Sequence, residues 1–203
     1  MLTRARILDS AALEVERNGM TQFRVKRVAS EAGVSVALLY SYFDDREDLI
    51  AETIVHRYCQ VLLGLVEIFT KPLQNVQTTA DLRAALRIMI AEAQIPERTE
   101  ARILRIEGIS FAKHNPTASA GILGAKKEAS DRILRCVQPL EDKKLLVEGM
   151  SAVAFARIWY ALFFGQIALE GEHALSIDPA DWLKALQVLS DSAIRPEYSD
   201  LAF

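Results

Sequence analysis

The sequence contains little cysteine and little histidine. Its two cysteines, Cys59 and Cys136, stand singly within apolar helical patterns, and its three histidines, His56, His114 and His173, are scattered. Because there is no C-x-x-C pair and no histidine at ligand spacing, neither a disulfide framework nor a zinc site is predicted. We expect two buried thiols in a reducing compartment, which indicates a cytoplasmic protein without a metal site.

The motifs of the common catalytic sites are also missing. The 203 residues contain no H-E-x-x-H, no G-x-S-x-G and no glycine-rich phosphate loop. His114 lies where a helix is expected to end, and the helix dipole favours a cation there, so a structural role is sufficient for it. We therefore expect that the protein is not an enzyme and that it uses no cofactor.

Basic residues are not in excess. The formal net charge is −3, from 24 Lys and Arg against 27 Asp and Glu. This balance gives no general attraction to nucleic acid, so any DNA binding has to be argued from a local surface.

Long apolar runs are rare, and one of them has the minimum length of a membrane span. Residues Ala152 to Leu169 are apolar except for Arg157 and Gln166. A charge near the middle and acidic residues directly after the run argue against a span. We expect a helix that is buried by its own domain and by a partner subunit, and no membrane partner.

Apolar residues at helical spacing are abundant. The chain is 51% hydrophobic, nearly every long segment has a period of 3.6 residues, and no segment alternates as a strand does. The sequence therefore predicts an all-α fold. In the first part of the chain, helices are expected from an N-cap at Thr3 to Asn18-Gly19, over 25–32, over 36–43, and from an N-cap at Asp45 to Thr70.

Caps and prolines predict the helices of the remaining chain. One starts at a capping box formed by Thr78 and Asp81, and the next starts at Pro96. The later helices are expected from Asn115-Pro116 to about Val137 before Pro139, from about Asp142 to Glu170 with an end at Gly171, and from Asp178-Pro179 to Ile194.

The segment Arg24 to Asp48 carries the strongest functional pattern. Two short helices are separated by Gly33, which permits a tight turn, and Ser35, which can cap the second helix. This is the pattern of a helix-turn-helix, whose second helix lies in the major groove of DNA. Leu39 and Phe43 are expected to point into the core. Residues Val36, Ala37, Tyr40 and Ser41 then face outward.

These residues resemble a known family. The runs ILDSAALEVERNG and VASEAGVSVALLYSYFDDREDL, within about residues 3 to 55, are similar to the N-terminal region of the TetR family of bacterial repressors. The resemblance implies a three-helix DNA-binding head, a variable helical body with an effector pocket, and a dimer formed by two C-terminal helices of each subunit. We place the head at residues 1–48 and the ligand-binding and dimerisation domain at 49–203.

The resemblance also implies roles for single residues. Tyr42 and Arg46 match positions that contact phosphates, and Lys26 matches a position that reaches a base or a phosphate. Arg24 stands where the family usually has Thr, and Val36 and Leu38 replace residues that are often Lys and Thr, so polar contacts are lost. The candidate DNA-binding residues are Thr3, Arg24, Lys26, Ser35, Val36, Ala37, Tyr40, Ser41, Tyr42 and Arg46.

The body gives no clear code for a ligand. Aromatic side chains often line apolar pockets, so the candidate ligand-binding residues are Phe111, Trp159, Tyr160 and Phe163, although core packing explains them as well. Charged residues after Pro96 can orient a polar ligand or form a solvated face: Glu100, Arg102, Arg105 and Glu107. The helices expected over 152–169 and 178–194 are the natural material of a two-fold interface.

These patterns favour a homodimeric repressor that binds double-stranded DNA at a palindromic operator and is released by a small-molecule effector. Two alternatives stay open. An activator uses the same parts, and a helical interaction protein without DNA binding is compatible with the acidic net charge.

Overall fold

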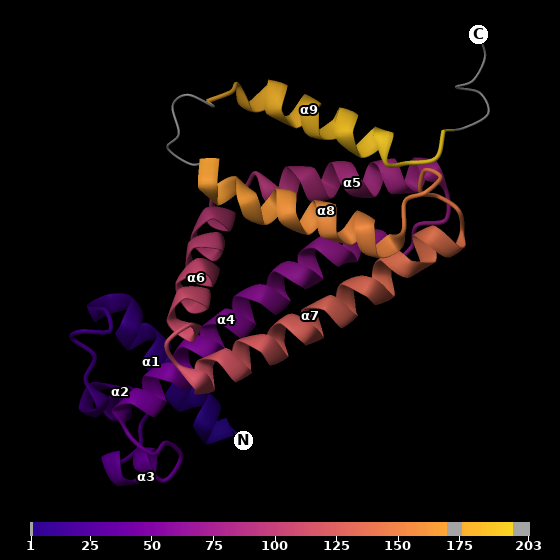
Figure 1. Ribbon diagram of the computed structural model, residues 1–203. Coiled ribbons are helices and arrows are strands. Elements are labelled where there is room, and N and C mark those ends of the chain that lie inside the picture. Colours follow the sequence, from indigo (N-terminus) through magenta and orange to yellow (C-terminus); the bar gives the residue numbers. More distant parts are fainter. Residues whose placement is uncertain (1, 170–175, 197–203) are drawn as a thin grey trace. The chain divides into compact units, whose positions relative to one another are not determined.

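The computed structural model describes residues 2–169 and 176–196, and the regular elements in this part of the chain are helices (Figure 1). The predicted all-α fold is confirmed. The helices are α1 (Leu2–Asn18), α2 (Val25–Glu31), α3 (Val36–Tyr40), α4 (Arg46–Thr70), η1 (Lys71–Leu73), α5 (Thr79–Ala93), α6 (Glu97–Ala112), α7 (Pro116–Asp142), α8 (Ala152–Gly165), η2 (Gln166–Leu169) and α9 (Pro179–Ser192).

The chain forms two units. The first contains residues 1–62 and 104–126, and the second contains residues 63–103 and 127–203. Helices α4, α6 and α7 each contribute residues to both. The predicted functional boundary after residue 48 is a different division of the chain and stays a prediction.

The core of the first unit holds the three N-terminal helices together. Ile7 of α1 and Val28 of α2 are fully buried. Leu39 of α3 and Phe43 have at most 1% of their surface exposed, so their predicted inward orientation is confirmed. Since α3 has only five residues, its stability depends on this packing rather than on its own hydrogen bonds.

Most helix starts are the predicted ones. Asp45 caps α4 by accepting a hydrogen bond from the Asp48 N–H at 2.7 Å. Thr78 and Asp81 form the predicted capping box of α5. Two further predicted caps are also confirmed. Asn115 Oδ1 accepts from the Ala118 N–H at 2.9 Å, and Asp178 Oδ1 accepts from the Ala180 N–H at 2.8 Å.

Several predicted boundaries are wrong. Helix α3, predicted over 36–43, ends at Tyr40, and Ser41 is its C-cap. Helix α1 already includes Leu2, so Thr3 lies inside the helix and is not its N-cap. Helix α7 does not stop before Pro139 but continues to Asp142. A proline in the last turn removes only one internal hydrogen bond, and the next residue, Leu140, is anchored in the core with 1% of its surface exposed.

The long helix predicted from Asp142 to Glu170 is interrupted. Lys144 adopts a left-handed conformation with φ 57° just after α7, which is a common way for a helix to end. Helix α8 then starts at Ala152 with Ser151 as its N-cap, and the Ser151 hydroxyl accepts from the Ala154 N–H at 3.2 Å. The predicted end at Gly171 lies outside the described residues.

The core of the second unit is built from α5, α7, α8 and α9. Leu82, Leu86, Phe155 and Leu186 are almost fully buried in it, and α5 packs against α9 (Figure 1). Phe163 of α8 stacks on Phe69, with ring centroids 4.9 Å apart.

Two helical segments are long and apolar enough to cross a membrane by length and composition alone, Arg46–Leu73 and Ala152–Leu169. The sequence analysis considered only the second. Both bury apolar side chains within the protein, among them Leu62, Val66, Phe155 and Trp159. A core helix passes the same test, so this signal is weak.

Two glycines of α7 allow a test of the packing in the first unit. A Cβ atom at Gly121 would lie 2.6 Å from Val55 Cγ1, and 3.3 Å from the Cβ of that short side chain, whereas one at Gly124 would meet nothing within 4 Å. Gly124→Ala should raise the free energy of unfolding by up to about 1 kcal/mol, because alanine favours the helix. Gly121→Ala should lower it by about 1–3 kcal/mol through overpacking. Urea unfolding of both variants measures this, and a stabilising Gly121→Ala would show that α4 and α7 are not in close contact there.

Candidate DNA-binding surface

Helices α2 and α3 form a helix-turn-helix. Gly33 has a φ of 64°, a conformation that glycine adopts without strain. The Val34 N–H donates to the Ala29 carbonyl at 2.9 Å, which closes the turn. Ser35 then caps α3, since its Oγ accepts from the Leu38 N–H at 3.0 Å. The turn therefore fixes where α3 starts.

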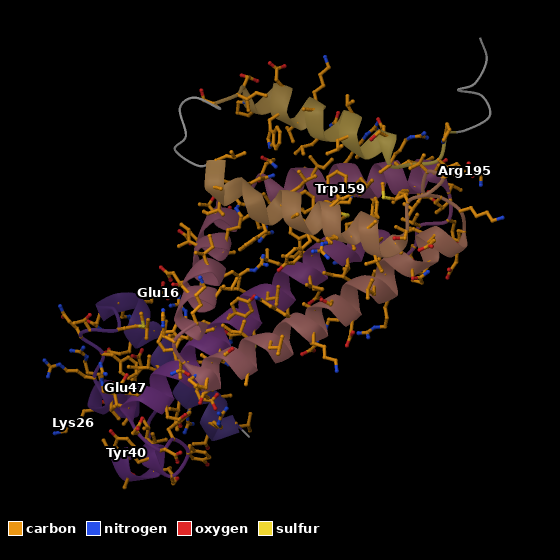
Figure 2. All side chains as sticks on the ribbon, viewed as in Figure 1. Glu16, Lys26, Tyr40, Glu47, Trp159 and Arg195 are labelled. Carbon is orange, nitrogen blue, oxygen red and sulfur yellow. The ribbon has the colours of Figure 1, made fainter. Side chains whose placement is uncertain are left out.

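The outer face of α3 is exposed and rich in apolar atoms. Ala37, Tyr40, Ser41 and Tyr42 are exposed, and Leu38, which was not among the candidate residues, is 43% exposed. Tyr40 lies at the outer edge of this helix in Figure 2.

Val36 does not lie fully outward as predicted. It is partly buried and packs against the core of the first unit, because it is in the first turn of α3, close to where the chain enters from α2. Part of the Val36 side chain therefore contacts this core, and the rest is exposed on the outer face.

The two serines of this segment use their hydroxyl groups locally. Ser35 Oγ is the cap of α3, and the Ser41 hydroxyl donates to the Leu38 carbonyl at 2.7 Å. Leu38 and Tyr40 of α3, and Tyr42 just after it, then provide most of the exposed surface with which this segment can contact a partner.

A buried carboxylate ties α1 to α2. Glu14 is 3% exposed, and its oxygens accept from the Arg24 backbone N–H at 3.0 Å and from Arg27 Nη2 and Nε at 2.6 and 2.8 Å. Asn18 donates to it from the same helix. Arg27 is therefore held by Glu14, so its charge is largely neutralised within the first unit.

The hydrogen bond from Arg27 is the main reason why the pKa of Glu14 lies below its ordinary value, and it outweighs the opposing effect of burial. The sequence analysis did not single out Glu14. A signal was present, because Glu14 follows Ile7 and Ala11 on the inner stripe of α1 at spacings of four and three residues.

Arg46, one of the candidate residues, and Arg4 are also engaged within the first unit. Arg46 donates to the Met20 carbonyl at 2.9 Å, pairs with Glu47 and lies over the Phe23 ring. Arg4 pairs with Glu52 at 2.9 Å and lies over the Phe43 ring. These contacts reduce the charge that both residues offer to an outside partner.

Arg24 and Lys26 differ from them. Both are exposed at the start of α2, and Lys26 lies at the outer edge of the head in Figure 2. Thr3, the remaining candidate, is half-buried in α1. The free positive charge of the helix-turn-helix is thus concentrated at the start of α2.

The four aromatic candidates for ligand binding do not form one group. Phe111 belongs to the first unit and packs against its core. Trp159 and Phe163 lie in the core of the second unit, with ring centroids 5.4 Å apart. Tyr160 is 40% exposed and stacks with Phe164.

The charged residues of α6 do not form the simple solvated face that was considered. Arg102 and Arg105 are 7% and 5% exposed, whereas Glu100 and Glu107 are exposed. The signal for this burial is the spacing of Arg98, Arg102 and Arg105, which places them on one stripe of the helix.

A turn with glycine between two short helices, an exposed second helix and a capped longer helix after it together define a helix-turn-helix protein. Residues 7–53 match the family model described as bacterial regulatory proteins of the tetR family. This match confirms the predicted resemblance to the N-terminal region of that family over these residues.

One curated relative is a transcriptional repressor. An HTH-type transcriptional repressor of Streptomyces coelicolor, SCO4008, is 35% identical over 63 residues, which are 31% of this chain and 33% of that protein. The match thus spans about a third of the relative's length, and it says nothing of the rest.

The likeness to solved structures covers nearly the whole chain. A TetR-family transcriptional regulator from Mesorhizobium loti has a TM-score of 0.66 at 18% identity, over 93% of both chains. A transcriptional regulator from Saccharomonospora viridis, in complex with choline, has a TM-score of 0.59 at 15% identity, over 95% of this chain and 98% of that one. At these identities the likeness shows the fold alone.

Replacing Glu14 tests whether its carboxylate holds the head together. Glu14→Gln should lower the free energy of unfolding at pH 7 by about 1–3 kcal/mol, because charged hydrogen bonds to Arg27 and Arg24 are lost. Since folding lowers the pKa of Glu14, this stabilisation is present above the ordinary pKa of glutamate and is lost as the pH falls through the lower folded value.

The gap between the wild type and Glu14→Gln in urea unfolding should accordingly shrink at acidic pH. Glu16→Gln is the matched control, because Glu16 is exposed on the same helix, and it should change stability by less than about 0.5 kcal/mol. Equal stability of the wild type and Glu14→Gln at pH 7 would contradict the assignment.

Proposed function

We propose that the protein is a dimeric transcriptional repressor that binds a palindromic operator in double-stranded DNA and is released by a small-molecule effector. One observation carries this proposal: within a domain matched by the TetR family model, α3 presents an exposed outer face beside a turn closed by Gly33 and Ser35. An exposed second helix is what insertion into a major groove requires.

The contacts of this helix follow from its exposed atoms. Ala37, Leu38 and the tyrosine rings suit thymine methyl groups, and the phenol groups of Tyr40 and Tyr42 can reach bases or phosphates. With so few hydrogen-bonding groups, part of the sequence preference comes from the shape of the DNA. The exposed Arg24 and Lys26 supply phosphate contacts at the start of α2.

An apolar surface on the last two helices supports a dimer. On α8, Val153 and Tyr160 are 56% and 40% exposed, and on α9 Val188 and Leu189 are 65% and 42% exposed. Helices of one chain that expose such residues commonly pair with the same helices of a second copy around a two-fold axis. Two copies of α3 then reach successive major grooves, about 34–36 Å apart or slightly more.

Release by an effector requires a ligand that favours a state unable to bind both half-sites. Helix α4 begins beside the helix-turn-helix at Arg46 and contributes Leu63 to Thr70 to the second unit. A ligand that moves α4 therefore alters the spacing of the two copies of α3. The choline complex of one solved structure of this fold supports a small-molecule ligand for this chain.

This role places the protein in the cytoplasm and needs no enzymatic activity. An activator differs from a repressor only in where its operator lies, and the exposed outer face of α3 favours DNA binding over an interaction protein without it.

Lys26 and Tyr40 test the DNA-binding mode. Lys26→Gln should weaken binding to all duplexes about equally and lower the slope of log affinity against log salt by about 1, since one phosphate contact is lost. Tyr40→Ala should instead lower the preference for particular base pairs by about 1–3 kcal/mol. Fluorescence anisotropy with labelled duplexes over a salt series measures both effects.

The control is Lys127→Gln, which makes the same charge change at an exposed position of α7 in the second unit. Its salt slope should equal that of the wild type. If Lys26→Gln and Tyr40→Ala also bind as the wild type does, the docking of α2 and α3 is wrong.

The dimer surface is tested by Val188→Glu. A carboxylate buried against a second copy should convert the dimer to monomers in sedimentation velocity runs, and it should reduce operator affinity, since one α3 alone contacts one half-site. Ile88→Glu is the control, because Ile88 is similarly exposed, at 53%, but lies on α5. A dimeric Val188→Glu protein would place the interface elsewhere.

A further inference from the structure

Polar side chains converge where α5 ends, within the second unit. Arg98 Nη2 donates to Glu92 Oε2 at 2.9 Å, and Arg102 Nη1 donates to the Ala93 carbonyl at 3.4 Å. The C-cap residue of α5, Gln94, lies next to them in sequence, and its Nε2 is 3.5 Å from Gln166 Oε1. Two guanidinium groups and two amides therefore gather at one helix end.

Arg102 and Gln166 are buried, which is unusual for an arginine, and Arg98 and Gln94 are half-buried. Arg102 and Gln166 are 7% and 9% exposed, and the Arg98 side chain is 19% exposed. Arg98 Nε and Gln166 Nε2 are enclosed and make no hydrogen bond to the described residues. Because buried donors are nearly always hydrogen-bonded, two such donors in one cluster point to an acceptor beyond the described residues, such as a bound ligand.

The helix end alone does not explain the cluster. The negative end of the α5 dipole favours a cation, and this accounts for Arg102 against the Ala93 carbonyl. It does not account for the enclosed Gln166 amide or for the remaining donor of Arg98, which already pairs with Glu92.

An aromatic surface leads to the cluster along α8. Trp159 and Phe163 lie on α8, and Gln166 is its C-cap residue. Their spacings of four and three residues place the three side chains along one face of this helix and its end. Phe69 stacks on Phe163. Trp159 is labelled in Figure 2. This face changes from aromatic to polar at Gln166.

We propose that this part of the second unit binds an amphipathic organic anion. Its carboxylate, or a group of like charge and geometry, accepts hydrogen bonds from Arg98 and Gln166, and its apolar body lies against Phe69, Trp159 and Phe163. Guanidinium groups bind carboxylates with two parallel hydrogen bonds, whereas a cationic ligand is repelled by them. The inference rests on the proposed function only in taking this anion as the effector.

The test is calorimetric titration of the full-length protein, without DNA, with molecules of one shape and different charge. Phenylacetate, phenylacetamide and 2-phenylethylamine share the ring and differ at the polar end, and octanoate with octylamine repeats the comparison for an aliphatic body. The carboxylates should bind, and they should bind at least about 10-fold more tightly than the amines. Equal or tighter binding of the amines, or no binding of either carboxylate, would overturn the proposal.

Variants locate the site. Arg98→Gln and Gln166→Leu should reduce the affinity for the carboxylate by about 10- to 30-fold and reduce its advantage over the amine. Arg87→Gln removes an exposed guanidinium from α5 and should leave both affinities unchanged. Arg98 is less buried than Gln166, so Arg98→Gln keeps the test valid if Gln166→Leu does not fold. Equal losses for Arg87→Gln and Arg98→Gln would show that only net charge matters.

The same protein with labelled operator DNA separates this proposal from the proposed function. Carboxylate binding that leaves operator affinity unchanged would confirm the site and contradict its role as effector site. Failure to bind DNA with normal carboxylate binding would overturn the proposed function alone.

Discussion

A five-residue helix cannot be stable alone, and the function of this protein depends on how α3 is held in place. Too few internal hydrogen bonds form to offset the cost of ordering it, so its position is set by Leu39 and Phe43 in the core of the first unit and by the Ser35 cap. The core in turn requires α1 and α2 to keep their relation, which the buried Glu14 carboxylate secures through Arg27 and the Arg24 backbone. A polar contact inside the head thus positions an outer face that makes few polar contacts of its own.

The same contacts divide the cations of the head into two groups. Arg4, Arg27 and Arg46 are paired with carboxylates or backbone carbonyls of the first unit, while Arg24 and Lys26 remain exposed. A chain with a net charge of −3 can therefore present positive charge where α2 begins without an overall basic character. In the second unit, by contrast, Arg102 is buried, and its Nη1 donates to the Ala93 carbonyl at the end of α5.

Much of the architecture could be predicted from the sequence because caps and turns are local signals. Asp45, Thr78, Asn115 and Asp178 each need only their own neighbours to start a helix, and Gly33 needs only its own φ. Three features could not be read in this way. Pro139 stays inside α7 because Leu140 is anchored by tertiary packing. Helical spacing places Glu14 and Arg102 on a stripe of their helices, but their burial also depends on the partners that tertiary packing brings to them, such as Arg27 for Glu14. The hydrogen bonds that Arg46 donates to the Met20 and Phe23 carbonyls were not predicted. The family pattern implies a phosphate contact at this position and gives no information on contacts within the head.

The central claim is that two copies of α3, fixed by the first unit and paired through the second, read DNA as a dimer. Selection of random duplexes by the purified full-length protein, at low salt and without added ligand, tests it most directly. The account predicts an enriched pseudo-palindrome whose half-sites are about one helical turn apart or slightly more. A folded dimer that enriches no sequence, or only a single unpaired half-site, would contradict it.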